Sequence, residues 1–305
     1  MQEINQASFA PVVRDQLGTE KIVRPSINYW EDAWRRLKKN KMSMGGLIVL
    51  IVLTIVAIIA PLLTNHTYAF QDYASKELAP NSQFWFGTDE FGRDMWTRIW
   101  WGTRISLFIG VMAALIDLII GVLYGGIAAY LGGRVDDILM RIMEIIYSIP
   151  FLLVTILLIM FLEPGVWTII IAYSITGWVG MARLVRGQIL QIKEQEFVLA
   201  ARTLGASPSR IILKHLIPNA LGIIIVQITF VVPSAIFAEA FLSFLGLGIK
   251  APLASLGALI SDGIGVLRFY PYRLIIPTII FSLILLSCNL LGDGLRDAFD
   301  PKLRK

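Results

Sequence analysis

Three carboxylates lie inside strongly apolar stretches of this sequence, where an uncompensated charge is expensive: Asp117, Glu144 and Glu239. Such a group can carry protons or ions along a pathway, or it can be held by a buried polar partner. Arg141 precedes Glu144 by one helical turn, so these two residues are predicted to form a structural ion pair. For Asp117 and Glu239, a pathway position and a buried polar contact both remain open.

A second acidic group lies in residues 87–94 and raises the question of a metal site. Its carboxylates are Asp89, Glu90 and Asp94. Their spacing does not match the alternating oxygen ligands of an EF-hand calcium loop. We therefore expect the glycines of this segment to form turns, and we expect no metal site.

The sequence lacks the common motifs of enzymes. His66 and His215 are the only histidines, and no HExxH, GxSxG or phosphate-binding loop is present. The chain is therefore expected not to be an enzyme, not to bind ATP itself and to need no cofactor. The single cysteine, Cys288, excludes an intrachain disulfide.

The elements that carry these residues are those of a membrane protein. Of the 305 residues, 56% are hydrophobic and 16% charged, and the mean hydropathy is +0.70. A stretch of about 20 apolar residues crosses a hydrocarbon core about 30 Å thick. We predict an all-α integral membrane protein with six transmembrane helices, at 44–63, 105–130, 142–162, 166–182, 220–245 and 274–291.

The positive charges predict the orientation of the chain. With the N-terminus inside, most of the 27 lysines and arginines fall on the inner side, as is usual for cytoplasmic segments. Both termini are therefore expected to be cytoplasmic. The predicted order is an N-terminal tail (1–43), a first span (44–64), a long extracytoplasmic loop (65–104), a five-helix core (105–296) and a C-terminal tail (297–305).

Two local patterns indicate contacts of these elements. At 28–41, Trp30, Trp34 and Leu37 share one face of a basic helix, which we expect to lie in the inner interface and to contact membrane lipid. Gly121 and Gly125 form a GxxxG pattern, which lets another helix approach closely. Packing within this chain is favoured over a subunit interface.

A polar stretch at 187–219, between the fourth and fifth spans, is patterned as two short cytoplasmic helices. Gly205 is suited to the left-handed residue that ends the first helix. Ser207 and Pro208 are suited to open the second as N-cap and first residue, and Pro218 is expected to end it. One face of the first helix carries an apolar stripe: Phe197, Ala200, Ala201 and Leu204. The small alanines suit docking in a groove of a partner protein.

This stretch resembles the cytoplasmic EAA loop of importer-type ABC permeases, in which Glu-Ala-Ala is followed by a Gly and later by a Pro. The dipeptide Ala200-Ala201, Gly205 and Pro218 have the spacing of that family. The family's glutamate falls on Leu199, and whether Glu196, one turn earlier, replaces it is left open.

Two further stretches are similar to the peptide and nickel branch of these permeases: GTDEFGRD at 87–94 and AEAFLSFLGLG at 238–248. Across nearly the whole chain, the sequence resembles the OppC/DppC type. The resemblance implies a MetI-like fold in a bacterial cell membrane, and it implies a second homologous permease subunit, two ATPase subunits that bind ATP, and an extracytoplasmic peptide-binding protein as partners. It also implies that the ATPase-coupling residues are Glu196, Phe197, Ala200, Ala201, Leu204, Gly205 and Pro218.

Two alternatives remain from the sequence. The solute could be nickel or another small molecule in place of a peptide. The chain could also be a proton-coupled secondary transporter that uses Asp117 and Glu239, although the internal repeats common in that class are not evident here. Nucleic acid is not expected as a partner.

Overall fold

The computed structural model describes residues 29–300, so the predicted tail residues 1–28 and 301–305 lie outside the described part. Within 29–300 the chain is helical, and the only β-type pairing is an isolated bridge between Thr88 and Asp94. Five helical stretches in this part are long and apolar enough to cross a membrane, and a bent helix pair makes a sixth if it counts as one span. The predicted all-α membrane fold is confirmed.

The helices follow one another along the chain as α1 (Tyr29–Lys39), α2 (Lys41–Ile59), α3 (Met95–Ile116), α4 (Val122–Leu131), α5 (Gly133–Ser148), α6 (Phe151–Leu162), α7 (Val166–Thr176), α8 (Val179–Ile192), α9 (Glu196–Thr203), α10 (Pro208–Ile211), α11 (Ile217–Phe244), α12 (Leu256–Val266) and α13 (Tyr272–Phe299). Short 3-10 turns, η2 (Ala60–Leu62) and η3 (Tyr73–Ser75), follow α2. Two π-helical turns, η4 (Asp117–Gly121) and η5 (Ile212–Leu216), join α3 to α4 and α10 to α11.

The second span begins earlier than the sequence predicted. Helix α3 starts at Met95 rather than at 105, so the loop that we predict to be extracytoplasmic, and call the outer loop, ends at Asp94. The reason is local, because the Asp94 carboxylate caps the helix by accepting hydrogen bonds from the backbone N–H groups of Trp96 and Thr97. The capped helix continues through η4 as one stretch, Met95–Leu131.

The predicted third span is a bent pair rather than a straight helix. Helices α5 and α6 meet at an angle of 75°. Ile149, between them, has extended backbone angles because the following Pro150 disfavours the helical conformation of the residue before it. Each helix is therefore too short to cross a bilayer core of about 30 Å alone, at about 1.5 Å per residue.

The helices beside the polar stretch are longer than predicted. Helix α8 continues to Ile192, so the exposed segment begins after it rather than at 187. The prediction that Pro218 ends a helix is wrong, because Pro208–Phe244 is one continuous helical stretch. The π-helical turn η5 precedes Pro218 and changes the hydrogen-bond register at the point where the proline lacks an N–H.

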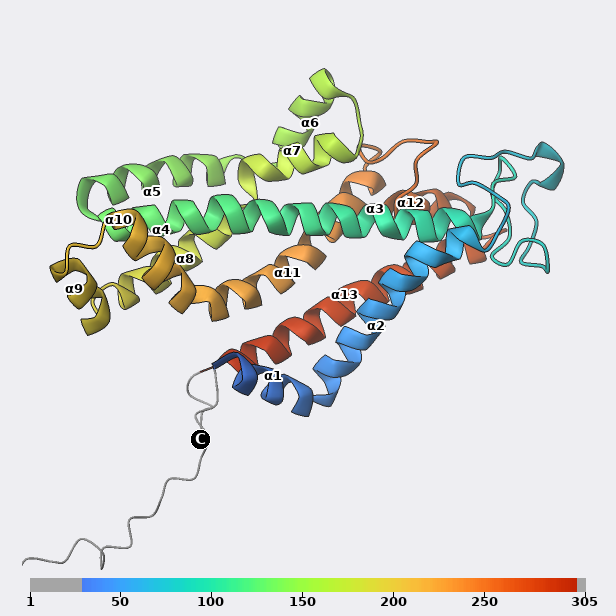
Figure 1. Ribbon diagram of the computed structural model, residues 1–305. Coiled ribbons are helices and arrows are strands. Elements are labelled where there is room, and N and C mark those ends of the chain that lie inside the picture. Colours follow the sequence, from blue (N-terminus) through green and yellow to red (C-terminus); the bar gives the residue numbers. More distant parts are fainter. Residues whose placement is uncertain (1–28, 301–305) are drawn as a thin grey trace, which may run out of the picture.

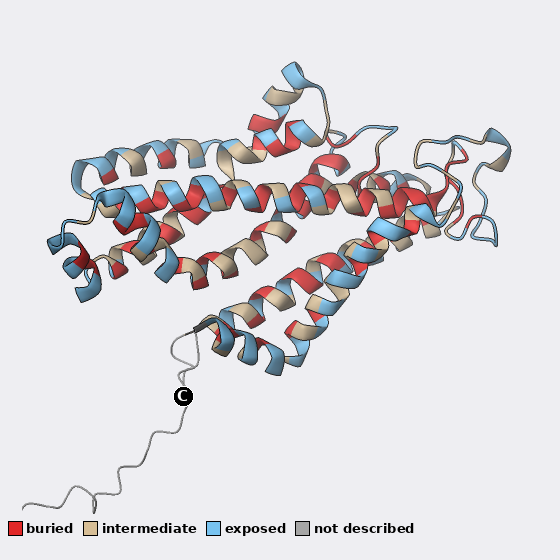
Figure 2. Cartoon of the chain, viewed as in Figure 1, coloured by how far each residue is buried: buried red, intermediate tan, exposed pale blue. Residues whose placement is uncertain are grey.

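The helices form an elongated bundle (Figure 1). The stretch α3–η4–α4 runs along the molecule, α8 and α11 pack on it, and α13 pairs with α2. Helix α9 lies at one end, and the loop between α2 and α3 lies at the opposite end. Figure 2 shows buried positions along the inner sides of the bundle and mainly exposed positions on α5, α9 and the outer side of α2.

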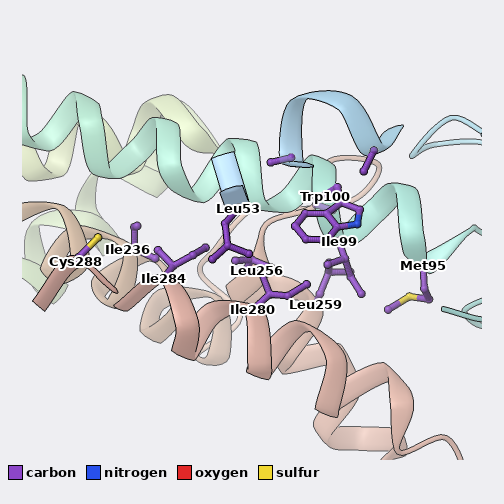
Figure 3. Packing of buried hydrophobic residues seen from close by; sticks show 13 residues of the cluster. Leu53, Met95, Ile99, Trp100, Ile236, Leu256, Leu259, Ile280, Ile284 and Cys288 are labelled. Carbon is purple, nitrogen blue, oxygen red and sulfur yellow. The ribbon is translucent and has the colours of Figure 1, made fainter. Parts of the chain in front are cut away.

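The largest apolar cluster joins five helices near the loop end. Figure 3 shows side chains of α2, α3, α11, α12 and α13 meeting there, including Leu53, Ile99, Ile236, Leu256 and Ile284. In a bilayer such side chains gain little from leaving lipid, so close packing is what holds the helices together. This cluster therefore fixes α12, which is too short to span, against the longer helices.

The GxxxG pattern packs within the chain, as favoured from the sequence. A Cβ added at Gly125 would overlap the backbone of Ala182 in α8, and one at Gly121 would lie 2.7 Å from the Met181 Cβ. The two glycines therefore let α8 approach the η4–α4 stretch at backbone distance.

Helix α1 packs on the end of α13, but its predicted apolar face is divided. Leu37 is buried with Ala298, whereas Trp30 and Trp34 are 44% and 47% exposed. Half-exposed tryptophans beside basic residues suit a bilayer interface. The contact of α1 with lipid stays a prediction.

Candidate coupling surface and buried polar sites

The exposed segment after α8 is a compact helical hairpin, and its turn residues behave as predicted. Gly205 has a φ of +80°, the left-handed conformation that glycine adopts without steric cost. The Ser207 hydroxyl accepts a hydrogen bond from the Arg210 N–H, and Pro208 opens α10. These caps end α9 and start α10 within a few residues, which fixes the hairpin's shape.

The four predicted stripe residues do not share one exposed face. Phe197 is 40% and Leu204 86% exposed, and Ala200 is exposed beside them. Ala201 is 9% exposed and faces the same side as the fully buried Val198. Ala201 therefore does not lie on the exposed side of α9 with the other three stripe residues, and its role in coupling stays a prediction. We define the coupling surface as Phe197, Ala200 and Leu204.

The inner face of α9 joins the hairpin to the bundle. Val198 belongs to an apolar cluster with Ile189 of α8, Ile211 of α10 and Leu216 of η5. The Lys193 ammonium, just before α9, donates a hydrogen bond of 3.0 Å to the Ala129 carbonyl of α4. Helix α9 is therefore packed directly against α8 and against the helix that begins at α10.

The remaining predicted coupling residues flank this surface. Glu196 is exposed in the first turn of α9, where a carboxylate is favoured by the helix dipole. Leu199, at the position of the EAA glutamate, is 45% exposed. Pro218 is exposed at the beginning of α11.

Glu239 is a buried polar contact. It is fully buried on α11, and its Oε1 accepts hydrogen bonds from the hydroxyls of Ser243 at 2.8 Å and Ser255 at 2.6 Å. The hydroxyl of Ser106 on α3 donates to Oε2 at 3.4 Å. The N–H of Leu256 donates to the Ser106 hydroxyl, so the network connects α3, α11 and the start of α12. This arrangement favours the structural alternative for Glu239.

Asp117 has a different environment. It is 3% exposed at the start of the π-helical turn η4, and its Oδ1 has no hydrogen-bond partner within residues 29–300. Within these described residues, Asp117 forms no hydrogen bond or ion pair with Glu239. The structure does not bring the two predicted pathway carboxylates together.

The predicted contact between Arg141 and Glu144 is present. The Arg141 Nη1 lies 2.9 Å from the Glu144 Oε2, but the side chains are 77% and 49% exposed. Exposed pairs contribute about 0–1 kcal/mol to stability. A structural role of this pair stays a prediction.

The GTDEFGRD stretch holds the loop between α2 and α3 together through hydrogen bonds and ion pairs. The Asp89 carboxylate accepts hydrogen bonds from the Arg93 Nε at 2.6 Å and the Arg93 N–H at 2.9 Å, and it forms an ion pair with Arg98. Glu90 pairs with Arg273 at the start of α13. Residues 29–300 contain no group of three or more His, Cys, Asp or Glu side chains arranged to hold a metal.

Two titratable groups in the connections between helices, Asp72 before α3 and Tyr270 before α13, have shifted pKa values. Hydrogen bonds from the Ser75 hydroxyl and the Ala74 N–H lower the pKa of Asp72, because they stabilise its charged form. The Tyr270 hydroxyl donates to Glu77 at 2.7 Å, and this bond raises the pKa of Tyr270. Both interactions tie loop segments to their neighbours.

No sequence pattern predicted the ion pair between Asp136 of α5 and Arg186 of α8. The two residues are far apart in the chain and belong to no motif. The partners of Glu239 were equally hidden, apart from Ser243, which follows it by one helical turn.

The bundle with its exposed hairpin has the fold of a MetI-like ABC transporter permease. Two crystal forms of the MetNI methionine ABC transporter in inward-facing conformations align with TM-scores of 0.51 and 0.52, at 21% sequence identity in each case. The alignments cover 64% and 65% of this chain and 94% of the matched chains. At this identity the likeness defines the fold alone.

The chain belongs to the family of binding-protein-dependent transport system inner membrane components, and within it to the OppC/DppC type. The family's sequence profile matches residues 121–305, and the profile of the N-terminal TM domain of oligopeptide transport permease C matches residues 28–80. The sequence resemblance is therefore confirmed, and the chain is a multi-span component of the cell membrane.

Similar proteins span nearly the same length. The dipeptide transport system permease protein DppC of Bacillus subtilis (strain 168) is 56% identical, and the alignment covers 94% of this chain and 90% of that protein. The oligopeptide transport system permease protein OppC of the same organism is 50% identical over the full length of both chains. OppC of Escherichia coli (strain K12) is 43% identical, with 94% and 95% covered.

Proposed function

We propose that this chain forms, with a second homologous permease subunit, the membrane pathway of an ABC importer for dipeptides or oligopeptides. An extracytoplasmic binding protein delivers the peptide, and two ATPase subunits bind and hydrolyse ATP. The chain itself holds no cofactor. The substrate class is supported by the DppC and OppC relatives, which are named for dipeptide and oligopeptide transport.

The observation that carries the proposal is the coupling surface on α9. Phe197 and Leu204 present apolar side chains at a polar end of the molecule, and the small Ala200 lies beside them. A permease without a phosphate-binding loop needs a mechanical contact with its motor, and an exposed helix of this kind can lay its apolar face into a groove of an ATPase subunit. Ala201 supports this surface from behind.

The other predicted coupling residues shape the hairpin or place a charge beside its apolar surface. Gly205 sets the turn after α9, and Pro218 lies where α10 and η5 continue into α11. Glu196 offers a carboxylate beside the apolar patch. It takes the place of the EAA glutamate, whose position is occupied by Leu199 in this chain. The end of the molecule with α9 is then cytoplasmic, and the braced loop at the other end (Figure 1) faces the binding protein.

Uptake by cells that lack this chain tests the proposal. Labelled dialanine and trialanine should accumulate in the parent strain, fail to accumulate in the deletion strain, and accumulate again when the full chain is supplied. Radioactive nickel is measured in the same three strains. If the chain restores nickel uptake and leaves peptide uptake unchanged, the nickel alternative replaces the peptide proposal.

A further inference from the structure

A pocket of 480 Å³ lies between α8, α11 and the end of α13, and side-chain amides line it. Gln188 and Gln191 come from α8, and Asn219 and Gln227 come from α11. Neither the coupling residues nor the buried carboxylates Asp117 and Glu239 belong to this lining. Gln188, Gln191 and Asn219 lie at the two ends of the stretch 187–219, but none of the four amides is among the residues that carry the EAA-loop resemblance.

The amides form two rows that face each other across the pocket. Gln188 and Gln191 are one helical turn apart on α8, and Asn219 and Gln227 are two turns apart on α11. Ile223 lies between the last two and also lines the pocket, so one continuous face of α11 is involved. The two helices pack against each other, which places both rows on one cleft.

These amides have hydrogen-bonding capacity that the chain itself does not use. Within residues 29–300, the side chains of Gln188, Gln191 and Gln227 form no hydrogen bond, and Asn219 donates only to the His215 carbonyl of the preceding turn. Each glutamine offers two donors and one acceptor. In a membrane-spanning stretch, polar side chains face the bundle interior or a water-filled cavity rather than lipid.

The lining of the pocket is suited to a ligand that both donates and accepts hydrogen bonds. Its residues on α8 and α11 are neutral, and the charged lining residues are Arg296 of α13 and Asp300, which follows the end of that helix. Neutral amides cannot select a ligand by its charge, but they pair with the N–H and C=O groups that every peptide main chain carries. We propose that Gln188, Gln191, Asn219 and Gln227 bind the main chain of the transported peptide. This inference rests on the proposed function and deepens it.

The position of the pocket connects peptide binding to the motor. Helix α8 leads directly into the hairpin, and α10 continues into α11 as one helical stretch. The two amide rows therefore lie on the two helices that flank the coupling surface. A displacement of α9 changes the distance between the rows, and so it changes how many hydrogen bonds a peptide can form there.

The first test uses the complete transporter, purified through this chain and reconstituted in liposomes with its binding protein. Uptake of labelled trialanine is compared for wild type and the triple variant Gln188→Leu, Gln191→Leu, Gln227→Leu. Leucine has a similar size but no hydrogen-bonding group. Uptake should fall at least about ten-fold, because several hydrogen bonds to the peptide are lost. The triple change to Asn, which keeps the amides, should retain more activity, and Gln83→Leu in the outer loop should have no effect.

The second test locates the peptide directly. In a Cys288→Ser background, Gln191→Cys should be alkylated by a bromoacetylated peptide only during ATP turnover, and unmodified trialanine should protect it. Ile138→Cys on the exposed side of α5 is the control. Normal uptake by the triple variant, or alkylation at position 191 that neither ATP nor trialanine affects, would overturn this inference alone. If the wild-type transporter takes up no peptide, the proposed function is overturned, and the inference with it.

Discussion

The guanidinium of Arg186 on α8 donates two parallel hydrogen bonds to the carboxylate of Asp136 on α5. They run from Nε to Oδ1 and from Nη2 to Oδ2, and each is 2.6 Å long. The side chains are 29% and 11% exposed. Parallel bonds of this kind add geometric specificity as well as energy. The pair therefore fixes the start of the bent α5–α6 unit against the helix that leads to the coupling surface.

Removing one partner of this pair should destabilise the protein. Asp136→Asn or Arg186→Gln leaves the other group partly buried without its partner, at a cost of about 1–3 kcal/mol. The double variant should be less destabilised than the sum of the two single variants. Thermal unfolding of the purified transporter measures this. The exposed pair gives the control, because Arg141→Gln should change stability by less than about 1 kcal/mol. If substitutions at the Asp136–Arg186 pair and at the Arg141–Glu144 pair lower stability equally, burial does not determine the strength of these ion pairs.

The Glu239 network predicts a second set of effects. Ser255→Ala removes a hydrogen bond to Glu239 and also the N-cap of α12, where the Ser255 hydroxyl accepts from the Ala258 N–H. The free energy of unfolding should fall by about 1–2 kcal/mol, which is measured as a lower melting temperature. Glu239→Gln should destabilise as well, because an NH₂ group then replaces Oε2 and cannot accept from the Ser106 hydroxyl.

The matched control for these variants is Ser174→Ala. The Ser174 hydroxyl donates only to the Ile171 carbonyl within α7, at a half-buried position outside the Glu239 network, so its removal should have little effect. If Glu239→Gln keeps full stability but abolishes uptake, Glu239 belongs to the pathway rather than to the structural network.

The features that the sequence predicted are those with short-range causes. The turn at Gly205 and the cap at Ser207 follow from residues next to them, and the spans follow from unbroken apolar composition. The partners of Glu239 could not be predicted, because Ser106 and Ser255 reach it only through packing of three helices. Ala201 was misplaced for another reason. Helix α9 is apolar on both its inner and outer sides, so periodicity alone does not say which side meets the bundle.

The orientation of the chain gives a third prediction. In a Cys288→Ser background, a cysteine at the exposed Ser82 of the outer loop should react with a membrane-impermeant thiol reagent applied to intact cells. A cysteine at the exposed Ser209 of α10 should react only after the cells are opened. The reason is the excess of lysine and arginine on the hairpin end. Labelling of position 209 in intact cells would reverse the proposed orientation.

The outer loop gives a fourth prediction. Gly92 has a φ of +71°, and an added Cβ would overlap the backbone of Asp72. Gly92→Ala should therefore separate the GTDEFGRD turn from the loop segment before it, and protease cleavage of the outer loop should become faster. Gly45→Ala in α2 is the control, since a Cβ there meets no atom within 4 Å. Unchanged cleavage in Gly92→Ala would show that the loop does not depend on this close approach.

The last prediction separates the coupling surface from the core behind it. Leu204 is 86% exposed and Val198 is fully buried, although both belong to the same hairpin. Leu204→Asp should leave the melting temperature and membrane abundance unchanged but remove the ATPase subunits during purification, because a charge is placed in an apolar contact with the partner. Val198→Asp should instead lower stability, because it buries an unpaired carboxylate among Ile189, Ile211 and Leu216. Thr203→Asp adds the same charge on α9 outside the coupling surface and should be much milder. The measurements are ATPase co-purification, peptide uptake and thermal unfolding at matched abundance. If Leu204→Asp keeps both the ATPase subunits and normal uptake, the exposed side of α9 is not the contact with the motor.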